Sequence, residues 1–297
     1  MKILVTGASG WIGSASVKEL LEAGHHVLGL ARNDDSAAKI EKLGAEAVRG
    51  SLDDPESLRR AAQSVEGVVH LAYNHDFSQM AAAAQTDRAA IEVFADVLQG
   101  TGGPLLIASG TLGLAVGRAG TERDLPQPGG HPRIANAAYT LGLTERGIRP
   151  IVVRFAPTVH GAGGDHGFVA VLAQTARAKG VSGYIEEGRN RWPAVNRLDA
   201  GELVRLAIDK APAGSALHAV AEEGIATRDI ATALGQALGL PTASIPADQA
   251  ASHFNWLGMF YGADIPASSV QTQVLLGWKP THPTLLDDIA AGHYPGL

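Results

Sequence analysis

Cysteine is absent from the 297-residue chain. Without thiols the protein can form no disulfide, no thiolate zinc site and no cysteine nucleophile. Charged residues are also scarce, at 18% of the sequence, against about a quarter in ordinary globular domains. The 24 lysines and arginines are outnumbered by 30 aspartates and glutamates, and no basic patch stands out. This charge balance disfavours a nucleic-acid partner.

Long hydrophobic runs are missing as well. No run approaches the roughly 20 apolar residues needed to span a bilayer. The segment Met1–Val5 is too short for the core of a signal peptide and is followed by no small-residue cleavage site. We therefore expect a cytoplasmic protein that has no membrane partner.

Glycine, in contrast, is abundant, with 36 residues, well above its usual share of about 7%. Apolar residues make up 45% of the chain. This composition excludes disorder, collagen and coiled coil, and it is typical of an α/β enzyme with many tight turns. The length suits one large domain or two smaller ones.

Short apolar segments alternate with helical segments through the first 155 residues. The predicted strands are 2–6, 26–31, 45–48, 67–72, 104–109 and 150–155. The predicted helices are 13–23, 37–43, 54–64, 86–99 and 134–146. Strands of this nearly continuous apolar kind are typical of a parallel sheet covered by helices on both faces. The sequence thus predicts an α/β fold with a doubly wound parallel sheet.

Beyond residue 157 the alternation weakens. Residues 161–165 and 184–192 are predicted as loops, and the last 50 residues as irregular. The elements expected in this region are a helix at 199–209, a strand near 216–220 and a helix at 227–238.

A glycine-rich turn follows the first predicted strand and opens the first helix, with the sequence T-G-A-S-G-W-I-G. Its first glycine, Gly7, allows the sharp turn, Gly10 lets the backbone approach a pyrophosphate, and Gly13 lets the helix pack closely on the sheet. Free N–H groups and the dipole favour an anion at the helix N-terminus. We predict a Rossmann-type dinucleotide site here, formed by Gly7, Ser9, Gly10, Trp11, Ile12 and Gly13.

The expected domains follow from this site. Residues 1–156, joined by the strand near 216–220, form the NAD(P)-binding domain, and residues 157–190 and 222–297 form a smaller substrate lobe. In open α/β sheets, ligands bind at the carboxyl ends of the strands. The predicted cleft therefore collects residues 72–76, 109–111 and 157–166.

The glycine turn resembles that of the short-chain dehydrogenase/reductase superfamily, in its extended and atypical branches, which carry T-G-x-x-G-x-x-G. Further segments resemble motifs of these epimerase/dehydratase-like proteins in the same order along nearly the whole chain. They are Gly50–Asp54, Val69–Ala72, Ile107–Thr111, Arg154–Gly161, Asn196–Asp199 and Leu275–Pro280. The resemblance implies a Rossmann fold and an NAD(P) cofactor.

The end of the second strand bears on the choice of cofactor. NAD-specific members of the family carry an acidic residue at the position of Ala31, and here Arg32 follows. A guanidinium suits a 2′-phosphate and can stack on adenine, although an arginine here can also be a solvated surface residue. We expect NADP, with NAD as the weaker ligand. The resemblance also implies cofactor contacts from Ser51, Leu52, Leu71, Ala72, Tyr73, Pro157 and Val159.

The catalytic centre departs from the family pattern. Family enzymes combine a Ser or Thr with Y-x-x-x-K, in which the lysine lowers the pKa of the tyrosine that exchanges a proton with substrate. No Y-x-x-x-K occurs here, since Leu143 stands four residues after Tyr139. Counted back from Arg154, the family's pair falls near Pro128 and Pro132.

Thr111 matches the family's Ser/Thr, which hydrogen-bonds the substrate oxygen, and Ser109 precedes it beside the cofactor. Tyr139 is retained as a catalytic candidate, although packing of its helix is the favoured explanation. Other residues that could transfer the proton are His75, Asp76, His131, Arg133, His160 and His166. No spacing matches a known metal motif, and we expect no metal.

The sequence therefore predicts an NADP-dependent oxidoreductase acting on a small carbonyl or alcohol. One alternative is a sugar-nucleotide epimerase or dehydratase, or a hydroxysteroid-type dehydrogenase, which the missing Y-x-x-x-K disfavours. Another is a non-catalytic protein that senses NADP. The expected partner is a small-molecule substrate, and a homodimer is left open.

Overall fold

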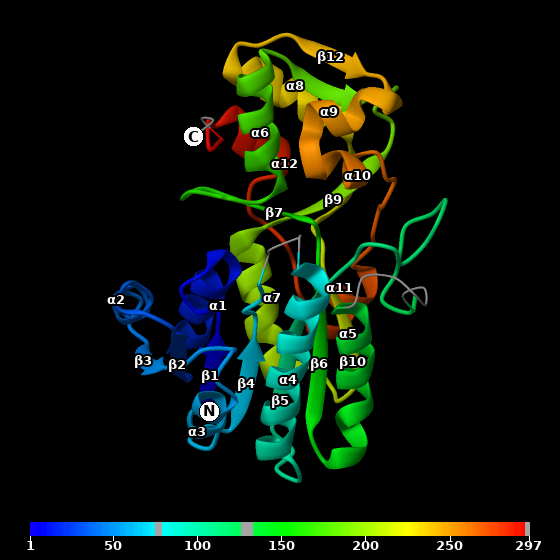
Figure 1. The fold of residues 1–297 in the computed structure, drawn as a ribbon. Helices are drawn as coiled ribbons and strands as arrows, with labels where there is room; N and C mark the ends of the chain where they lie inside the picture. Colours follow the sequence, from blue (N-terminus) through cyan, green and yellow to red (C-terminus); the bar gives the residue numbers. More distant parts are fainter. Residues whose placement is uncertain (75–78, 126–132, 295–297) are drawn as a thin grey trace.

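The computed structural model describes residues 1–74, 79–125 and 133–294. Its principal sheet has seven strands, all of them parallel. They are β1 (Lys2–Thr6), β2 (His26–Ala31), β3 (Glu46–Arg49), β4 (Gly67–His70), β5 (Pro104–Gly110), β6 (Arg149–Phe155) and β10 (Ser215–Ala219). Their order is β10-β6-β5-β4-β1-β2-β3 (Figure 1). The predicted parallel α/β sheet is confirmed.

Helices cover both faces of this sheet because its strand residues are apolar on both sides. The helices are α1 (Trp11–Glu22), α2 (Asp34–Lys42), α3 (Pro55–Ala62), α4 (Met80–Leu98), α5 (Arg133–Leu141) and α7 (Arg197–Lys210). In β1, Ile3 and Val5 share a core with α1, α2 and α7. The residue between them, Leu4, shares the opposite core with α3, α4 and α5. A short 3-10 helix, η2 (Gly142–Arg146), continues α5.

Local sequence explains most of the element boundaries. The strands β1 and β2 begin and end where the apolar runs predict. Helix α2 begins three residues before its predicted start, because the Asn33 side chain accepts a hydrogen bond from the Ser36 amide and caps the helix there. Helix α3 begins at Pro55 behind the cap Asp54, as the sequence indicates.

Most of the remaining elements lie above the carboxyl-terminal edge of the sheet, whereas α11 packs against β10 and α7 (Figure 1). The strands β7 (Thr158–His160), β9 (Arg191–Asn196) and β11 (Glu222–Ala226) form one small sheet, and β8 (Ser182–Ile185) pairs with β12 (Thr242–Ile245). The helices are α6 (Phe168–Lys179), α8 (Thr227–Leu238), α9 (Ala250–Phe254), α10 (Gly258–Tyr261), α11 (Val270–Leu276) and α12 (Leu285–Ala290), with 3-10 turns η3 (Ala247–Gln249) and η4 (Asn255–Leu257).

This upper region contains more regular structure than the sequence predicts. The loop expected at 184–192 is wrong at both ends, because β8 continues to Ile185 and β9 begins at Arg191. The last 50 residues, expected to be irregular, contain several short helices. Long-range contacts decide these elements. Strand β8 pairs with a strand far along the chain, and the Trp192 ring meets Phe168 and Tyr261 edge-on at 5.5 Å each.

The strand expected near 216–220 is β10, which pairs with β6 at the edge of the principal sheet. The division of the chain into two lobes at the stated boundaries stays a prediction. No helix in the described ranges is long and apolar enough to cross a membrane.

Candidate active site

The glycine turn between β1 and α1 leaves no room for a side chain at Gly7 or Gly13. Gly7 has a φ of +71°, and the Gly10 amide donates to the Gly7 carbonyl at 2.9 Å. A Cβ on Gly13 would lie 2.0 Å from that same carbonyl oxygen. Helix α1 has neither a side-chain cap nor an acidic residue in its first turn. Its free N–H groups therefore remain available to an anion.

Three further turn residues, Ser9, Trp11 and Ile12, are half-buried. The Trp11 indole N–H donates to the Val159 carbonyl at 2.7 Å, which ties the turn to β7. The segment that begins at Pro157, after β6, therefore runs beside the glycine turn. The structure thus brings the predicted residues from the turn and from the segment after β6 to one edge of the sheet.

The end of β2 offers a cation and no carboxylate at the decisive position. Ala31 is fully buried, and Arg32 is exposed, with no hydrogen bond or ion pair to any residue in the described ranges. The nearby Asp34 is paired with Arg49. Ser51 and Leu52 follow β3 and are half-buried, with the Ser51 amide donating to Ser57 Oγ at 3.2 Å.

A buried polar relay supports the segment Leu71–Tyr73 after β4. The Ala72 amide donates to Thr6 Oγ1 at 3.1 Å, and this hydroxyl lies 2.7 Å from His70 Nδ1. On its other side, His70 Nε2 is 3.2 Å from an oxygen of Asp87, which is 2% exposed. The relay fixes the backbone at the point where the chain leaves the sheet.

Asp87 is held in its charged form inside the protein. Burial raises its pKa, but the hydrogen bond and charge of His70, with help from Arg133 and Asn136, bring the pKa below its ordinary value. Asn136 Nδ2 donates to Asp87 at 2.7 Å and to the Ala84 carbonyl at 2.9 Å. A residue of α5 is thereby fixed to α4 at the edge of the candidate site.

Arg133, the first residue of α5, stacks on Tyr73. Its guanidinium carbon lies 4.0 Å from the centroid of the phenol ring. Burial raises the pKa of Tyr73, while the charge of Arg133 opposes that rise. Burial lowers the pKa of Arg133. At neutral pH this pair is a protonated phenol under a cation.

Thr111 follows β5 and carries a buried hydroxyl that bonds to nothing in the described structure. The residue is 3% exposed, and its amide donates to the Phe155 carbonyl at 3.2 Å. Its Oγ1 has no hydrogen-bond partner among the residues described. Ser109, two residues earlier, lies within β5 opposite Arg154 and is buried.

Tyr139 lies elsewhere. The Arg88 guanidinium carbon sits 3.3 Å from its ring centroid, and the side chain packs on the core shared by α3, α4 and α5. This placement favours the packing interpretation of Tyr139 over a catalytic one.

The other residues considered for proton transfer fall into two groups. His75, Asp76, His131 and the positions Pro128 and Pro132 lie outside the described residues. His160 is fully buried, with Nδ1 2.6 Å from Asp288, and His166 is exposed. Within the described ranges, no group of three or more His, Asp or Glu residues could hold a metal ion.

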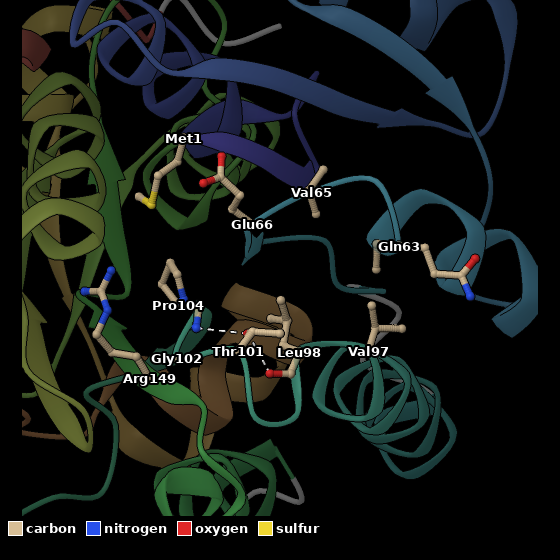
Figure 2. A pocket seen from close by; sticks show the side chains of 12 residues that line it. Met1, Gln63, Val65, Glu66, Val97, Leu98, Thr101, Gly102, Pro104 and Arg149 are labelled. Carbon is tan, nitrogen blue, oxygen red and sulfur yellow. Dashed lines mark hydrogen bonds between the residues drawn. The ribbon is translucent and has the colours of Figure 1, made fainter.

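A cavity of about 460 Å³ lies at the opposite edge, where the strands begin (Figure 2). Its two charged side chains are already bonded. Glu66 accepts from the Lys2 amide at 2.7 Å, and Arg149 donates to the carbonyls of Ala211 and Ile208 at 2.9 and 2.7 Å. We therefore do not assign this cavity as the site.

Sequence reasoning missed two features of the site. The first is the buried pair of His70 and Asp87. The sequence indicates it only through Asp87, an aspartate on a face of α4 that is otherwise apolar. The second is Arg197, whose guanidinium carbon lies 4.5 Å from the Trp11 ring centroid. Nothing in the sequence distinguishes Arg197 from a surface arginine.

Comparisons with known proteins point to one family. Residues 3–113 match the model of the NAD dependent epimerase/dehydratase family. An uncharacterized protein of Schizosaccharomyces pombe is 46% identical over 296 residues, which are 99% of this chain and 100% of that protein. A 4-hydroxy-2-methyl-3-oxo-4-farnesyl-3,4-dihydroquinoline-1-oxide ketoreductase of Stigmatella aurantiaca is 25% identical over 292 residues, covering 93% of this chain and 86% of its own.

Among solved structures, the Thermus thermophilus UDP-glucose 4-epimerase in complex with NAD is similar over 100% of this chain and 99% of its own. The TM-score is 0.77 and the sequence identity 21%. At this identity the likeness shows the fold alone.

Proposed function

Because the chain belongs to the NAD-dependent epimerase/dehydratase family of the extended short-chain dehydrogenase/reductase superfamily, we propose that it is an NADP-dependent oxidoreductase that reduces a small carbonyl compound. The observation that carries this proposal is the buried hydroxyl of Thr111, which has no hydrogen-bond partner among the described residues. Family membership supports NAD(P)-dependent chemistry, and the preference for NADP and the carbonyl substrate are what we propose beyond it.

The hydroxyl of Thr111 is costly unless a ligand satisfies it. A buried polar group without a hydrogen bond costs about 1–3 kcal/mol. Thr111 follows β5, at the edge where ligands of open α/β sheets bind. A carbonyl oxygen placed there would accept the hydrogen bond of the hydroxyl, and its position would then be fixed for the reaction.

The residues present fit a dinucleotide. The glycine turn is too tight for any side chain at Gly13, and the uncapped α1 N-terminus suits a pyrophosphate. Ala31 offers no carboxylate to a ribose hydroxyl, and the exposed Arg32 can meet a 2′-phosphate. When bound, the reduced nicotinamide supplies the hydride that adds to the carbonyl carbon.

The protein must then supply a proton to the carbonyl oxygen, and we assign this role to Tyr73. Its raised pKa keeps the phenol protonated at neutral pH, which is the form an acid needs. The Arg133 cation above the ring stabilises the phenolate that remains after transfer. Tyr73 follows β4 and Thr111 follows the adjacent β5, so both belong to one edge. The pair would replace the missing Y-x-x-x-K.

The first experiment measures NADPH oxidation against a panel of aldehydes and ketones. We expect Thr111→Val to lower kcat/KM by about 10²-fold or more, as for removal of an oriented donor, and Thr111→Ser to recover most of it. NADPH affinity should be unchanged in both variants. A wild-type protein that binds NADPH but reduces no carbonyl would contradict the proposal and favour the NADP-sensing alternative.

A matched pair of tyrosine variants tests the proton donor. Both Tyr73 and Tyr139 lie under an arginine guanidinium, so the two changes to phenylalanine remove the same atoms from similar surroundings. We expect Tyr73→Phe to cost about 10²–10⁴-fold in kcat and Tyr139→Phe to cost less than about tenfold. The reverse order would transfer the role to Tyr139.

A further inference from the structure

The N-termini of α1 and α7 lie side by side. The two helices pack closely (Figure 1), and a Cβ on Gly201 of α7 would lie 2.8 Å from the Ala15 carbonyl carbon of α1. This packing brings Arg197, the first residue of α7, over the ring of Trp11, the first residue of α1. The guanidinium therefore sits beside the glycine turn although 186 positions separate the two residues.

The side chain of Arg197 is held in a defined place. Trp11 is fixed by its hydrogen bond to the Val159 carbonyl, and its ring offers a cation–π surface to the guanidinium at 4.5 Å. On the other side, a Cβ on Gly161 would stand 3.2 Å from Arg197 Cγ, and one on Gly163 would stand 3.7 Å from its Nη2. The half-buried side chain thus passes between the indole and a glycine-rich segment.

No anion in the described structure neutralises this cation. Arg197 makes no hydrogen bond or ion pair with the residues described, and burial alone lowers its pKa. The nearest acid in sequence, Asp199, is already bonded to the Thr281 amide and to the His282 amide and ring. A cation in the first turn also stands at the unfavourable end of the helix dipole. Three sources of positive potential therefore converge: the guanidinium and the two helix N-termini.

We propose that Arg197 binds the pyrophosphate of the dinucleotide beside the glycine turn. This inference rests on the proposed cofactor. A guanidinium offers parallel N–H groups that match phosphate oxygens, and Trp11 holds it in place before the ligand arrives. The ligand chemistry is the diphosphate that NAD, NADP and ADP-ribose share, so Arg197 contributes to affinity without selecting between the two cofactors.

The test is the dissociation constant of ADP-ribose, NAD and NADP, measured by calorimetry for the wild type and Arg197→Gln. We expect all three ligands to weaken by the same factor, about 10- to 100-fold, the usual range for a charge-assisted hydrogen bond. Arg197→Lys keeps the positive charge but lacks the paired N–H groups of a guanidinium, so its affinities should lie between those of the wild type and Arg197→Gln. Arg205→Gln is the control on the same helix, because that guanidinium lies among Glu19, Glu202 and Asp209.

Each outcome has a distinct meaning. Unchanged affinity for ADP-ribose in a folded Arg197→Gln protein overturns this inference and leaves the cofactor assignment intact. A loss confined to NADP would also overturn it, because the contact would then be to the 2′-phosphate. A wild-type protein that binds none of the three ligands overturns the proposed function itself. Thermal unfolding of each variant separates these results from damage to the fold.

Discussion

The two edges of the seven-stranded sheet differ in how their polar groups are used. At the amino-terminal edge, Glu66 and Arg149 border a cavity of about 460 Å³, and both are bonded to the protein's own backbone. At the carboxyl-terminal edge, neither of two polar groups is satisfied within the described structure: the buried Thr111 hydroxyl has no hydrogen-bond partner, and Arg197 has no anion.

The contrast teaches that a cavity by itself does not locate a site. Parallel strands direct all their carboxyl ends to one edge, and the loops that follow can keep donors unbonded there. The groups at the amino-terminal edge are already satisfied, so a ligand would gain little from them. Variants at the two edges should therefore have very different consequences for binding.

The largest effect is expected from Gly13→Ala. The added methyl would overlap the Gly7 carbonyl, so the turn must open and α1 must move off the sheet. We expect loss of measurable NADPH fluorescence enhancement and a fall of about 1–3 kcal/mol in the free energy of unfolding. Gly142→Ala is the control, since its Cβ would meet nothing within 4 Å. Normal NADPH binding by Gly13→Ala would refute the turn as the cofactor site.

The largest effect on stability, as distinct from cofactor binding, is expected from Asp87→Asn, which removes the buried charge opposite His70. Breaking such a pair costs about 3–5 kcal/mol of unfolding free energy, and chemical denaturation measures it. The pKa of Asp87 is lowered in the folded protein, so its contribution is present above the unfolded value of about 3.9 and is lost as pH falls through the folded pKa. The difference between wild type and variant should shrink at acid pH. A constant difference would argue against a charged Asp87.

A smaller and more selective effect is expected from Arg32→Gln. Loss of a charge-assisted contact to the 2′-phosphate should weaken the binding of NADP by about 1.5–3 kcal/mol and leave the binding of NAD unchanged. Calorimetric titration with both cofactors decides it. An equal loss for the two would show that Arg32 does not contact the 2′-phosphate. Compared with Arg197→Gln, this variant separates the contribution of the 2′-phosphate from that of the pyrophosphate in the same ligand.

The smallest effect belongs to the amino-terminal edge. Glu66→Gln and Arg149→Gln should leave kcat/KM and NADPH affinity within about twofold, because neither residue faces the proposed ligands. Arg149→Gln should lose only about 1 kcal/mol of stability, from the carbonyls it caps at the end of α7. A large change in cofactor affinity from either variant would contradict the assignment of the cofactor site to the carboxyl-terminal edge.

The sequence predicts the strands and turns of the principal sheet well, because local sequence determines them. Strands such as β1 and β2 are short apolar runs bounded by turns, so hydrophobicity alone sets their limits. The glycine turn works in the same way, since the spacing of Gly7, Gly10 and Gly13 requires a particular backbone. Strand β8 differs, because it exists only through its pairing with β12. Helix α6 was not predicted, although apolar residues recur along it at helical spacing.

The same distinction between local sequence and long-range contacts applies to the residues of the candidate site. Thr111 could be selected because the end of its apolar strand resembles the family's Ser/Thr motif. The absence of its hydrogen-bond partner depends on the packing of the finished fold. Arg197 could not be selected at all, because only the contact of α1 with α7 brings it to Trp11. Tyr73 was expected to contact the cofactor. The arginine stacked on it, Arg133, is the first residue of α5 and lies 60 positions further along the chain, so the sequence did not indicate this contact.

The position of β10 has a consequence for synthesis of the chain. Strand β6 ends at Phe155, and its neighbour β10 begins at Ser215. At about 5–20 residues per second, a ribosome takes several seconds to make what lies between. During that time Ile151–Val153 of β6 can pair with β5 on one side, but the side that β10 will cover stays open and can pair with another chain. We therefore expect polypeptides that stop before residue 215 to aggregate or to occupy chaperones, so the dinucleotide half cannot be produced by simple truncation.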